Sequence, residues 1–220
     1  MSIPLAIRCP LCDFDNAYFF WHGGKASRDR DFYRCDTCDL VFVPERFFIS
    51  REDERERYLQ HNNEIYDPGY RKFLSNLYDE IKPHLKPESS GLDFGAGPGP
   101  ALVHMMKEDG YDVHMYDPYF SPSTKPLEKT YDFVTCTETL EHLREPRRDL
   151  DRLNSLLRSP GWLGVMTGML DDRDEFPSWY YHRDPTHICF YSRVTMKWIA
   201  QKYLWSVYFP AANVTLFHKS

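Results

Sequence analysis

From residue 91 onward, short apolar runs alternate with segments in which apolar residues recur every three or four positions. The apolar runs predict strands at 91–94, 112–116, 131–136 and 162–168. The helical spacing predicts helices at 100–109, 146–157 and 192–202. Two further apolar segments predict a C-terminal antiparallel hairpin at 205–209 and 214–218. We therefore expect a doubly wound, mostly parallel α/β sheet with right-handed crossovers.

The first ninety residues show different patterns. A strand-like run at 40–44 closes an N-terminal segment that is rich in aromatic and charged residues. Charges of alternating sign over 51–57 predict an exposed helix. Apolar residues at helical spacing over 70–81 predict a helix that packs against the core. The expected organisation is a small unit at 1–44, a helical linker or cap at 45–90 and the α/β domain at 91–220.

Four of the six cysteines form two C-x-x-C pairs, Cys9 with Cys12 and Cys35 with Cys38, and 22 residues separate the pairs. Each pair presents two sulfurs to one ion, and two such pairs suit tetrahedral thiolate coordination. We expect the 1–44 unit to be a zinc ribbon that holds a structural Zn²⁺ through these four side chains. The alternative is two unrelated turns with reduced thiols.

A glycine-rich segment, 93–99, joins the first predicted strand of the sheet to the first helix. Its alternating glycines let the backbone turn sharply and approach a ligand closely. Twenty residues beyond Gly97, the next strand ends at Asp117, which is placed to accept hydrogen bonds from ribose hydroxyls. Asp93 before the loop would repel a diphosphate and suit a cationic ligand, and Pro98 removes one amide donor. A cofactor that contains a nucleoside is the leading inference; a turn without a ligand is the alternative.

This arrangement resembles class I S-adenosylmethionine-dependent methyltransferases, whose first motif is an acidic residue followed by G-x-G-x-G. Asp117 matches the ribose-binding acid of that family, and the strand at 131–138 matches a later one. The resemblance covers about residues 70–218 and implies a Rossmann-like fold. It also implies S-adenosylmethionine as cofactor, bound by Asp93, Phe94, Gly95, Ala96, Gly97, Gly99, Asp117, Pro118, Thr135, Cys136 and Thr137.

The chain departs from this family between the second and third predicted strands. Only 13 residues separate Asp117 from Tyr131, and several of them are prolines or serines. A complete helix and strand hardly fit in that length. We expect the usual third strand of the family, with its acid that contacts adenine, to be shortened or absent.

The strand at 131–136 runs into Glu138, Glu141 and His142, at the sheet edge where such folds bind ligands. On a helical turn, their spacing would project all three from one face. The block resembles the E-x-x-E-H element of ubiquinone-type and small-RNA O-methyltransferases, in which it binds a metal that engages the acceptor hydroxyl. His187 matches a further histidine of the small-RNA group. We therefore expect these four residues to be catalytic, and three roles stay open: ligands of a divalent cation, a metal-free general base at His142, or purely structural contacts.

Two other segments are candidates for covering the site. The connection at 170–187 is too long for an ordinary strand-to-helix turn, and long loops at a ligand edge often form substrate walls. Its aromatic residues Trp179, Tyr180 and Tyr181 either flank a planar acceptor or pack on their own domain. The stretch 61–66 is a weaker candidate for covering the cofactor.

Composition limits the range of partners. The 220 residues are 42% hydrophobic and suit one domain with a small appendage. The chain has no apolar run of membrane-spanning length, and residues 1–8 lack a secretory pattern, so we expect a soluble, cytoplasmic protein without membrane contact. The net charge of −6 makes broad binding to nucleic acid unlikely on electrostatic grounds.

The sequence thus predicts S-adenosylmethionine-dependent methyl transfer to an oxygen, with carbon as the less favoured atom, of a small-molecule acceptor. One alternative is an RNA methyltransferase that reads nucleic acid with its zinc ribbon. Another is a binding module without catalysis. The oligomeric state and the identity of the acceptor do not follow from the sequence.

Overall fold

The computed structural model describes residues 7–60 and 63–220. Most of the N-terminal stretch considered above, residues 1–6, lies outside the described residues, as do His61 and Asn62 of the suggested cover over the cofactor. No helix in the described part of the chain combines the length and the apolar character that crossing a bilayer requires.

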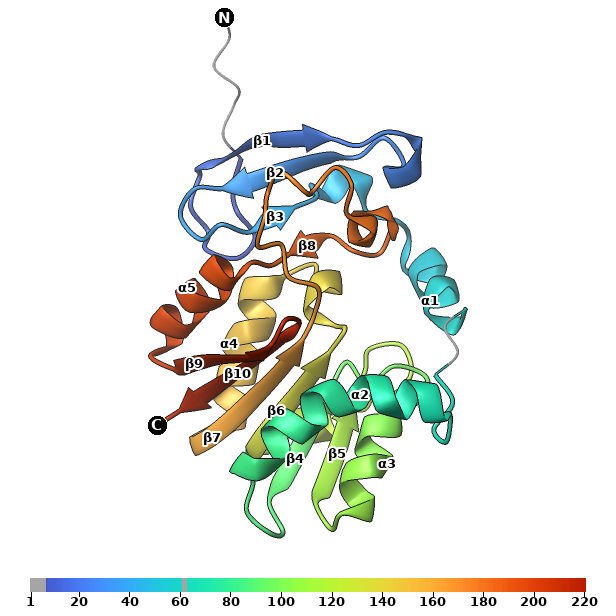
Figure 1. The fold of residues 1–220 in the computed structure, drawn as a ribbon, viewed down its shortest axis with the longest axis vertical. Coiled ribbons are helices and arrows are strands. Elements are labelled where there is room, and N and C mark those ends of the chain that lie inside the picture. Colours follow the sequence, from blue (N-terminus) through green and yellow to red (C-terminus); the bar gives the residue numbers. More distant parts are fainter. Residues whose placement is uncertain (1–6, 61–62) are drawn as a thin grey trace, which may run out of the picture.

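The central sheet has six strands in the order β5-β4-β6-β7-β10-β9 (Figure 1). Strands β5, β4, β6 and β7 are parallel, whereas β10 runs antiparallel to both β7 and β9. The doubly wound, mostly parallel sheet with a C-terminal hairpin is therefore confirmed. The strands are β4 (Ser90–Phe94), β5 (Asp112–Tyr116), β6 (Tyr131–Thr137), β7 (Leu157–Met166), β9 (Ser206–Ala211) and β10 (Val214–Lys219).

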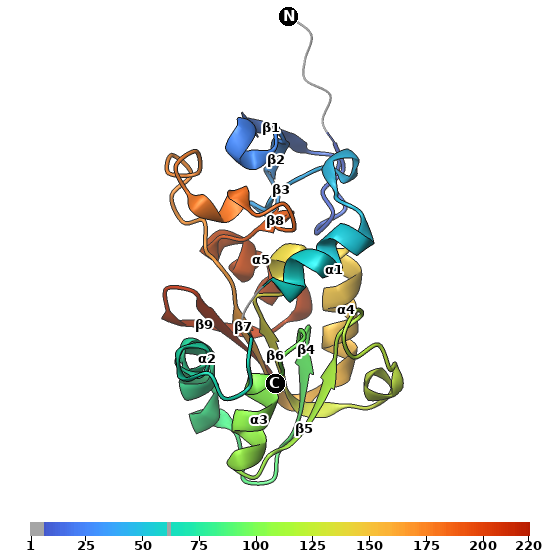
Figure 2. The same ribbon diagram turned by 90° about the vertical axis from the view of Figure 1, so that its right-hand side faces the viewer.

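Two helices cover each face of this sheet (Figures 1 and 2). Helices α2 (Pro68–Ile81) and α3 (Ala101–Glu108) lie on one face, and α4 (Pro146–Leu156) and α5 (Arg193–Tyr203) lie on the other. Side chains alternate along a strand, so β6 sends Phe133 into the apolar cluster under α2 and Val134 into the cluster under α4. The apolar spacing read from the sequence thus reflects burial on both faces.

Strand β5 is an edge strand of the described sheet. The connection 117–130 that follows it contains a single bridge between Asp117 and Ser121 and a 3₁₀ turn at Lys125–Glu128, without a strand or an α-helix. The expectation that the third strand of the family is shortened or absent is therefore confirmed. Its loss leaves the carboxyl end of β5 without a neighbour on one side.

The N-terminal residues form a second, four-stranded antiparallel sheet beyond the carboxyl ends of the parallel strands (Figure 1). Its first three strands are β1 (Ala17–His22), β2 (Asp31–Cys35) and β3 (Val41–Phe42). The fourth strand, β8 (Cys189–Phe190), comes from the long connection before α5 and pairs with β3. Strand β8 was not predicted, because two residues show no periodicity. The ribbon and this connection consequently share one apolar cluster.

Between the two sheets lies helix α1 (Arg51–Leu59), which begins at the N-cap Ser50. Ser50 accepts a hydrogen bond from the backbone N–H of Asp53, which satisfies one of the free donors of the first turn. The predicted exposed helix is confirmed, with one exception on its inner side. Glu54 is only 6% exposed, because this side of α1 faces the site described next.

Candidate active site

The glycine-rich loop joins β4 to α3 at the carboxyl edge of the sheet. Gly95 and Gly97 have φ angles of +83° and +65°, which residues with a Cβ rarely adopt. A Cβ on Gly95 would also lie 2.3 Å from side-chain atoms of Thr139. A Cβ on Gly99 would lie 1.6 Å from the carbonyl oxygen of Asn63. The glycines therefore permit close approach by two neighbouring protein segments, in addition to the turn that the sequence predicted.

Asp117 is 7% exposed and lies beside the same loop. Its Oδ2 atom accepts a hydrogen bond from the backbone N–H of Gly97 at 3.0 Å. Its Oδ1 atom accepts hydrogen bonds from the N–H groups of Tyr119 at 2.8 Å and Phe120 at 3.0 Å. A carboxylate offers about four acceptor positions, so one position on Oδ2 is left for a further donor. The predicted ribose acid therefore also fixes the loop.

Asp93 is buried beneath the loop and accepts a hydrogen bond from the Thr135 hydroxyl at 2.7 Å. Burial raises the pKa of Asp93 to about 6. The hydrogen bond from Thr135 opposes this rise, and the nearby charge of Asp117 adds to it. This acid is therefore placed to support the loop from below.

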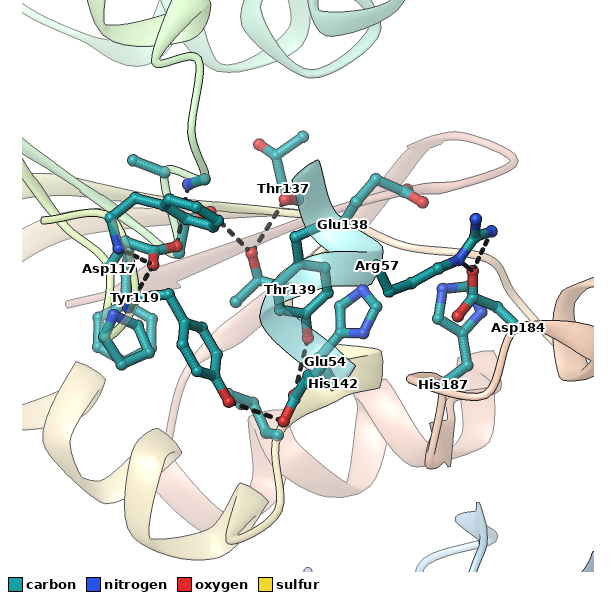
Figure 3. Close-up of a pocket in the computed structure, with 18 of the residues that line it drawn as sticks. Glu54, Arg57, Asp117, Tyr119, Thr137, Glu138, Thr139, His142, Asp184 and His187 are labelled. Carbon is teal, nitrogen blue, oxygen red and sulfur yellow. Dashed lines mark hydrogen bonds and ion pairs between the residues drawn. The ribbon is translucent and has the colours of Figure 1, made fainter. Parts of the chain in front are cut away.

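A cavity of about 840 Å³ opens at this edge (Figure 3). Its lining comes from the glycine loop, from helices α1, α2 and α4, and from the segments 116–120, 137–145 and 180–187. The predicted cofactor residues in the lining are Phe94, Gly95, Ala96, Gly97, Asp117, Pro118 and Thr137. The remaining four lie outside it: Asp93, Gly99, Thr135 and Cys136.

Three predicted acceptor residues come together beside the cavity: His142 and His187 line it, and Glu141 is buried next to them. One ligand atom each of Glu141, His142 and His187 lies within 4.8 Å of the other two. The Nδ1–H of His142 donates to the carbonyl of Thr186 at 3.1 Å, and that of His187 donates to the carbonyl of Tyr181 at 2.8 Å. Each ring therefore keeps the lone pair of Nε2 free, which is how metal-ligating and general-base histidines are held.

Glu141 is fully buried, and both of its oxygens have partners. Its Oε1 accepts a hydrogen bond from the Tyr181 hydroxyl, and its Oε2 accepts one from the Thr167 hydroxyl at 2.8 Å. Burial lowers the pKa of His187 to about 4, and the neighbouring His142 adds to this, so the His187 ring is neutral near pH 7. A buried glutamate side chain beside two imidazoles is a donor set suited to a divalent cation.

Glu138 lies apart from this group. The expected helical turn through Glu138, Glu141 and His142 is wrong, because the 3₁₀ turn begins only at Leu140 and Glu138 has a φ of +46°. Its Oε2 lies 3.2 Å from the Tyr181 hydroxyl, which Glu141 shares. Burial, and then the charge of Glu141, raise the pKa of Glu138 above its ordinary value. Glu138 therefore holds a proton more readily than an exposed glutamate does.

The family comparison bears directly on this geometry. A family model described as a methyltransferase domain matches residues 63–207, about two thirds of the chain. The chain belongs to this methyltransferase family. It is an S-adenosylmethionine-dependent class I methyltransferase, in agreement with the glycine loop and Asp117. No curated protein matches the chain.

Solved structures resemble this methyltransferase at low sequence identity. A protein from Pyrococcus horikoshii OT3 is 14% identical, with a TM-score of 0.50, over 75% of this chain and 99% of its own. The pyocyanin biosynthetic protein PhzM is also 14% identical, with a TM-score of 0.50, over 75% of this chain and 61% of its own. An S-adenosylmethionine-dependent methyltransferase from Thermotoga maritima is 15% identical, with a TM-score of 0.45, over 77% of this chain and 95% of its own. At these identities the likeness shows the fold alone.

Sequence reasoning missed the contribution of helix α1 to the methyltransferase site. Glu54 accepts hydrogen bonds from the hydroxyls of Tyr58 at 2.8 Å and Tyr119 at 2.7 Å, and from Arg144 at 2.9 Å (Figure 3). Burial, and then the Glu54 interaction, raise the pKa of Tyr119 to about 12, so its hydroxyl stays protonated. The alternating charges of α1 did not predict these contacts, because the partners of Glu54 outside α1, Tyr119 and Arg144, come from distant segments.

A second link joins α1 to the acceptor side. The Arg57 guanidinium donates twice to Oδ2 of Asp184, at 3.0 and 2.8 Å (Figure 3). Burial alone would raise the pKa of Asp184, but the hydrogen bonds from Arg57 and Thr186 hold it well below its ordinary value. Helix α1 therefore contacts both the segment after Asp117, through Glu54, and the segment that carries His187, through Arg57.

The long connection at 170–187 divides its aromatic residues between packing and the cavity. Trp179 and Tyr181 stack with ring centroids 4.8 Å apart, and Tyr181 is buried. Tyr180 is 70% exposed and lines the cavity. Of these three aromatic residues, Tyr180 and Tyr181 line the cavity and Trp179 does not.

The four paired cysteines are buried together, with their sulfurs within 4.8 Å of one another. The Sγ atoms of Cys9 and Cys38 are 3.5 Å apart, and those of Cys12 and Cys35 are 3.4 Å apart. Tetrahedral zinc with Zn–S bonds of about 2.3 Å requires sulfurs about 3.8 Å apart. The cluster therefore fits a Zn²⁺ ion, and it ties the two knuckles of the ribbon together.

Proposed function

We propose that this methyltransferase transfers a methyl group to an oxygen of a small-molecule acceptor, assisted by a divalent cation on Glu141, His142 and His187. The observation that carries the proposal is the convergence of these three side chains, with both imidazoles fixed through Nδ1. Two histidines and one carboxylate leave coordination positions open for acceptor oxygens. A cation held there would lower the pKa of the acceptor hydroxyl and orient it.

The cofactor side is assigned from the loop and Asp117. The backbone of Gly95 and Gly97 would receive the methionine part of S-adenosylmethionine, and the free position on Asp117 would accept a ribose hydroxyl. The acceptor oxygen attacks the sulfonium methyl group, the C–S bond breaks, and S-adenosylhomocysteine leaves. With both histidines holding the cation, the hydroxyl proton passes to solvent; without a cation, Nε2 of His142 would accept it. The protein otherwise contributes position and exclusion of water.

The size of the cavity and the charge of the chain support a small acceptor. About 840 Å³ falls within the range of roughly 300–1,000 Å³ typical of small-molecule sites. The net charge of −6 gives no general attraction for a nucleic-acid backbone. Tyr180 and Tyr58, which both line the cavity, offer aromatic surface for a planar acceptor.

The test follows labelled methyl transfer from S-adenosylmethionine into a cell extract and its small-molecule fraction. Activity should fall after mild chelation that leaves the ribbon zinc in place, and added Mn²⁺ or Mg²⁺ should restore it. His187→Ala and Glu141→Gln should lose transfer while keeping cofactor affinity by calorimetry. Lys129→Ala, at an exposed position beyond β5, is the matched control.

Each outcome has a distinct meaning. Full activity after chelation would refute the cation. If His142→Ala then lost activity while His187→Ala and Glu141→Gln kept it, the His142 ring would be assigned as the base. Label that appears in RNA and is lost with rising salt would refute the small-molecule acceptor. Absence of heat with S-adenosylmethionine would refute the cofactor assignment itself.

A further inference from the structure

Arg30 is a buried cation of the zinc ribbon that contacts the acceptor side of the α/β domain. It is 2% exposed and lies at the start of β2. Its Nε donates to the carbonyl of Ser27 at 3.0 Å. Its two Nη atoms donate to four carbonyls of one distant segment, those of His182, Asp184, Pro185 and His187. All five N–H donors of the guanidinium are thus used by main-chain oxygens.

Such an arrangement needs a planar fork with a permanent charge. Burial lowers the pKa of Arg30 to about 10, opposed by the charge of Asp184, so the group stays protonated near pH 7. A buried cation is costly unless hydrogen bonds replace its water, and here five carbonyls replace it. A lysine would offer three donors from a single point and could not satisfy the same set.

Six of the seven carbonyls of the segment 181–187 are divided between two sets of partners. Those of residues 182, 184, 185 and 187 accept from Arg30, whereas those of Tyr181 and Thr186 accept from the rings of His187 and His142. Because neighbouring peptide groups of a short turn cannot rotate independently, fixing the first set fixes the direction of the second. The orientation of both histidines therefore depends on the Arg30 contacts.

The rest of the ribbon supports this contact. The Ser27 hydroxyl lies 2.8 Å from Nδ1 of His182, in the same segment. Phe32, two residues beyond Arg30, packs edge-on against Phe176 and Phe190 with ring centroids 5.1 and 5.7 Å away. The ribbon face that carries Arg30 is thus committed to the acceptor segment.

We propose that Arg30 is a positioning residue, whose guanidinium fork holds segment 181–187 so that His142 and His187 present Nε2 to the cation of the proposed function. The inference rests on the proposed function for the role of the two histidines. It also assigns a purpose to the zinc ribbon: the ribbon supplies a rigid base for Arg30 within the active site.

The test compares Arg30→Ala and Arg30→Lys with the control Arg46→Ala in the zinc-loaded full chain. Arg46 also belongs to the N-terminal part, but it is 54% exposed and forms a surface ion pair with Asp31. Hydrogen exchange reports on segment 181–188, where the N–H of Ile188 donates to the carbonyl of Glu141. Calorimetry gives the affinity for S-adenosylmethionine and, separately, for Mn²⁺.

In Arg30→Ala we expect loss of exchange protection in 181–188, retained protection in β4 and β6, and unchanged affinity for S-adenosylmethionine. Mn²⁺ affinity should fall about 10- to 100-fold, as when other groups that orient metal ligands are removed. Arg30→Lys should lie between Arg30→Ala and the wild type, and Arg46→Ala should match the wild type. This split between the two ligands is not expected from a general loss of stability.

Wild-type protection and Mn²⁺ affinity in Arg30→Ala would overturn the proposal. If that variant loses protection throughout the sheet, Arg30→Lys decides: local loosening supports the fork, and wild-type behaviour refutes it. If the wild type itself binds no Mn²⁺, the proposed cation fails. Exchange in 181–188 and the transfer rate at saturating cofactor then still test Arg30 separately.

Discussion

Replacing Asp117 with asparagine separates two roles of this acid, namely holding the glycine loop and binding ribose. The side chain accepts hydrogen bonds from three backbone N–H groups: Oδ2 accepts one from Gly97, and Oδ1 accepts one each from Tyr119 and Phe120. Asparagine keeps only one acceptor oxygen. If that oxygen stays with Tyr119 and Phe120, the new NH₂ group faces the N–H of Gly97, and this hydrogen bond is lost.

The expected cost can be worked from this count. One hydrogen bond to a charged group contributes about 1.5–3 kcal/mol to stability. Asparagine also removes a carboxylate that is 7% exposed, and the relief of its desolvation cost offsets part of the loss. We therefore expect Asp117→Asn to destabilise the cofactor-free protein by about 1.5 kcal/mol, the lower end of that range. Affinity for S-adenosylmethionine should fall by about tenfold or more.

Urea unfolding without ligand gives the first quantity, and calorimetric titration gives the second. Asp112→Asn is the matched control, since it begins the same strand and its side chain is 71% exposed. A variant with wild-type unfolding midpoint and weakened cofactor binding would show that Asp117 acts only on the ligand. The argument that it organises the loop would then be wrong.

Three further perturbations test other parts of the structure. Arg57→Met should destabilise the protein near pH 7. Because the pKa of Asp184 is depressed in the folded state, this loss of stability is present above about pH 4 and shrinks as the pH falls further; urea unfolding at several pH values measures it. Cys12→Ser should abolish zinc retention, with the wild type releasing about one Zn²⁺ per chain to a chromogenic chelator after thiol modification. Gly95→Ala should lower the melting temperature more than Gly110→Ala: both have positive φ, about 1–2 kcal/mol of strain, but only the first collides with a neighbouring side chain.

The parts of the fold that local sequence determines were predictable. The predicted strands at 91–94, 112–116 and 131–136 correspond to β4, β5 and β6, and the glycines between β4 and α3 permit the turn that follows. The two C-x-x-C pairs likewise carry their own geometry, because each short knuckle holds both sulfurs near one point. In these cases the residues that cause the structure are neighbours in the sequence.

The parts that depend on distant partners were not predictable from one sequence. Strand β8 is two residues long and exists because Phe190 pairs with Val41, far away in the chain. Nothing in the sequence around Arg30 distinguishes it from a surface arginine; its role depends on five carbonyls, four of them from a distant segment. Glu141 and His142 were identified as candidates, but the positive φ of Glu138 removed it from their group. Each of these features is decided by the tertiary contact and leaves no periodicity behind.

The missing third strand explains why helix α1 matters to this site. With β5 at the sheet edge, the segment after Asp117 has no strand of the described sheet on its outer side, and its own backbone hydrogen bonds are local ones to Asp117. Glu54 supplies the support from α1, since it holds the hydroxyl of Tyr119 and, through Arg144, the segment after His142. One buried carboxylate of α1 therefore joins the segment after Asp117 to the segment after His142. Arg30 makes a different contact: from the residue before β2 it holds the carbonyls of the segment that carries His187. Two elements that precede the α/β sheet in the chain therefore fix segments that line the cavity.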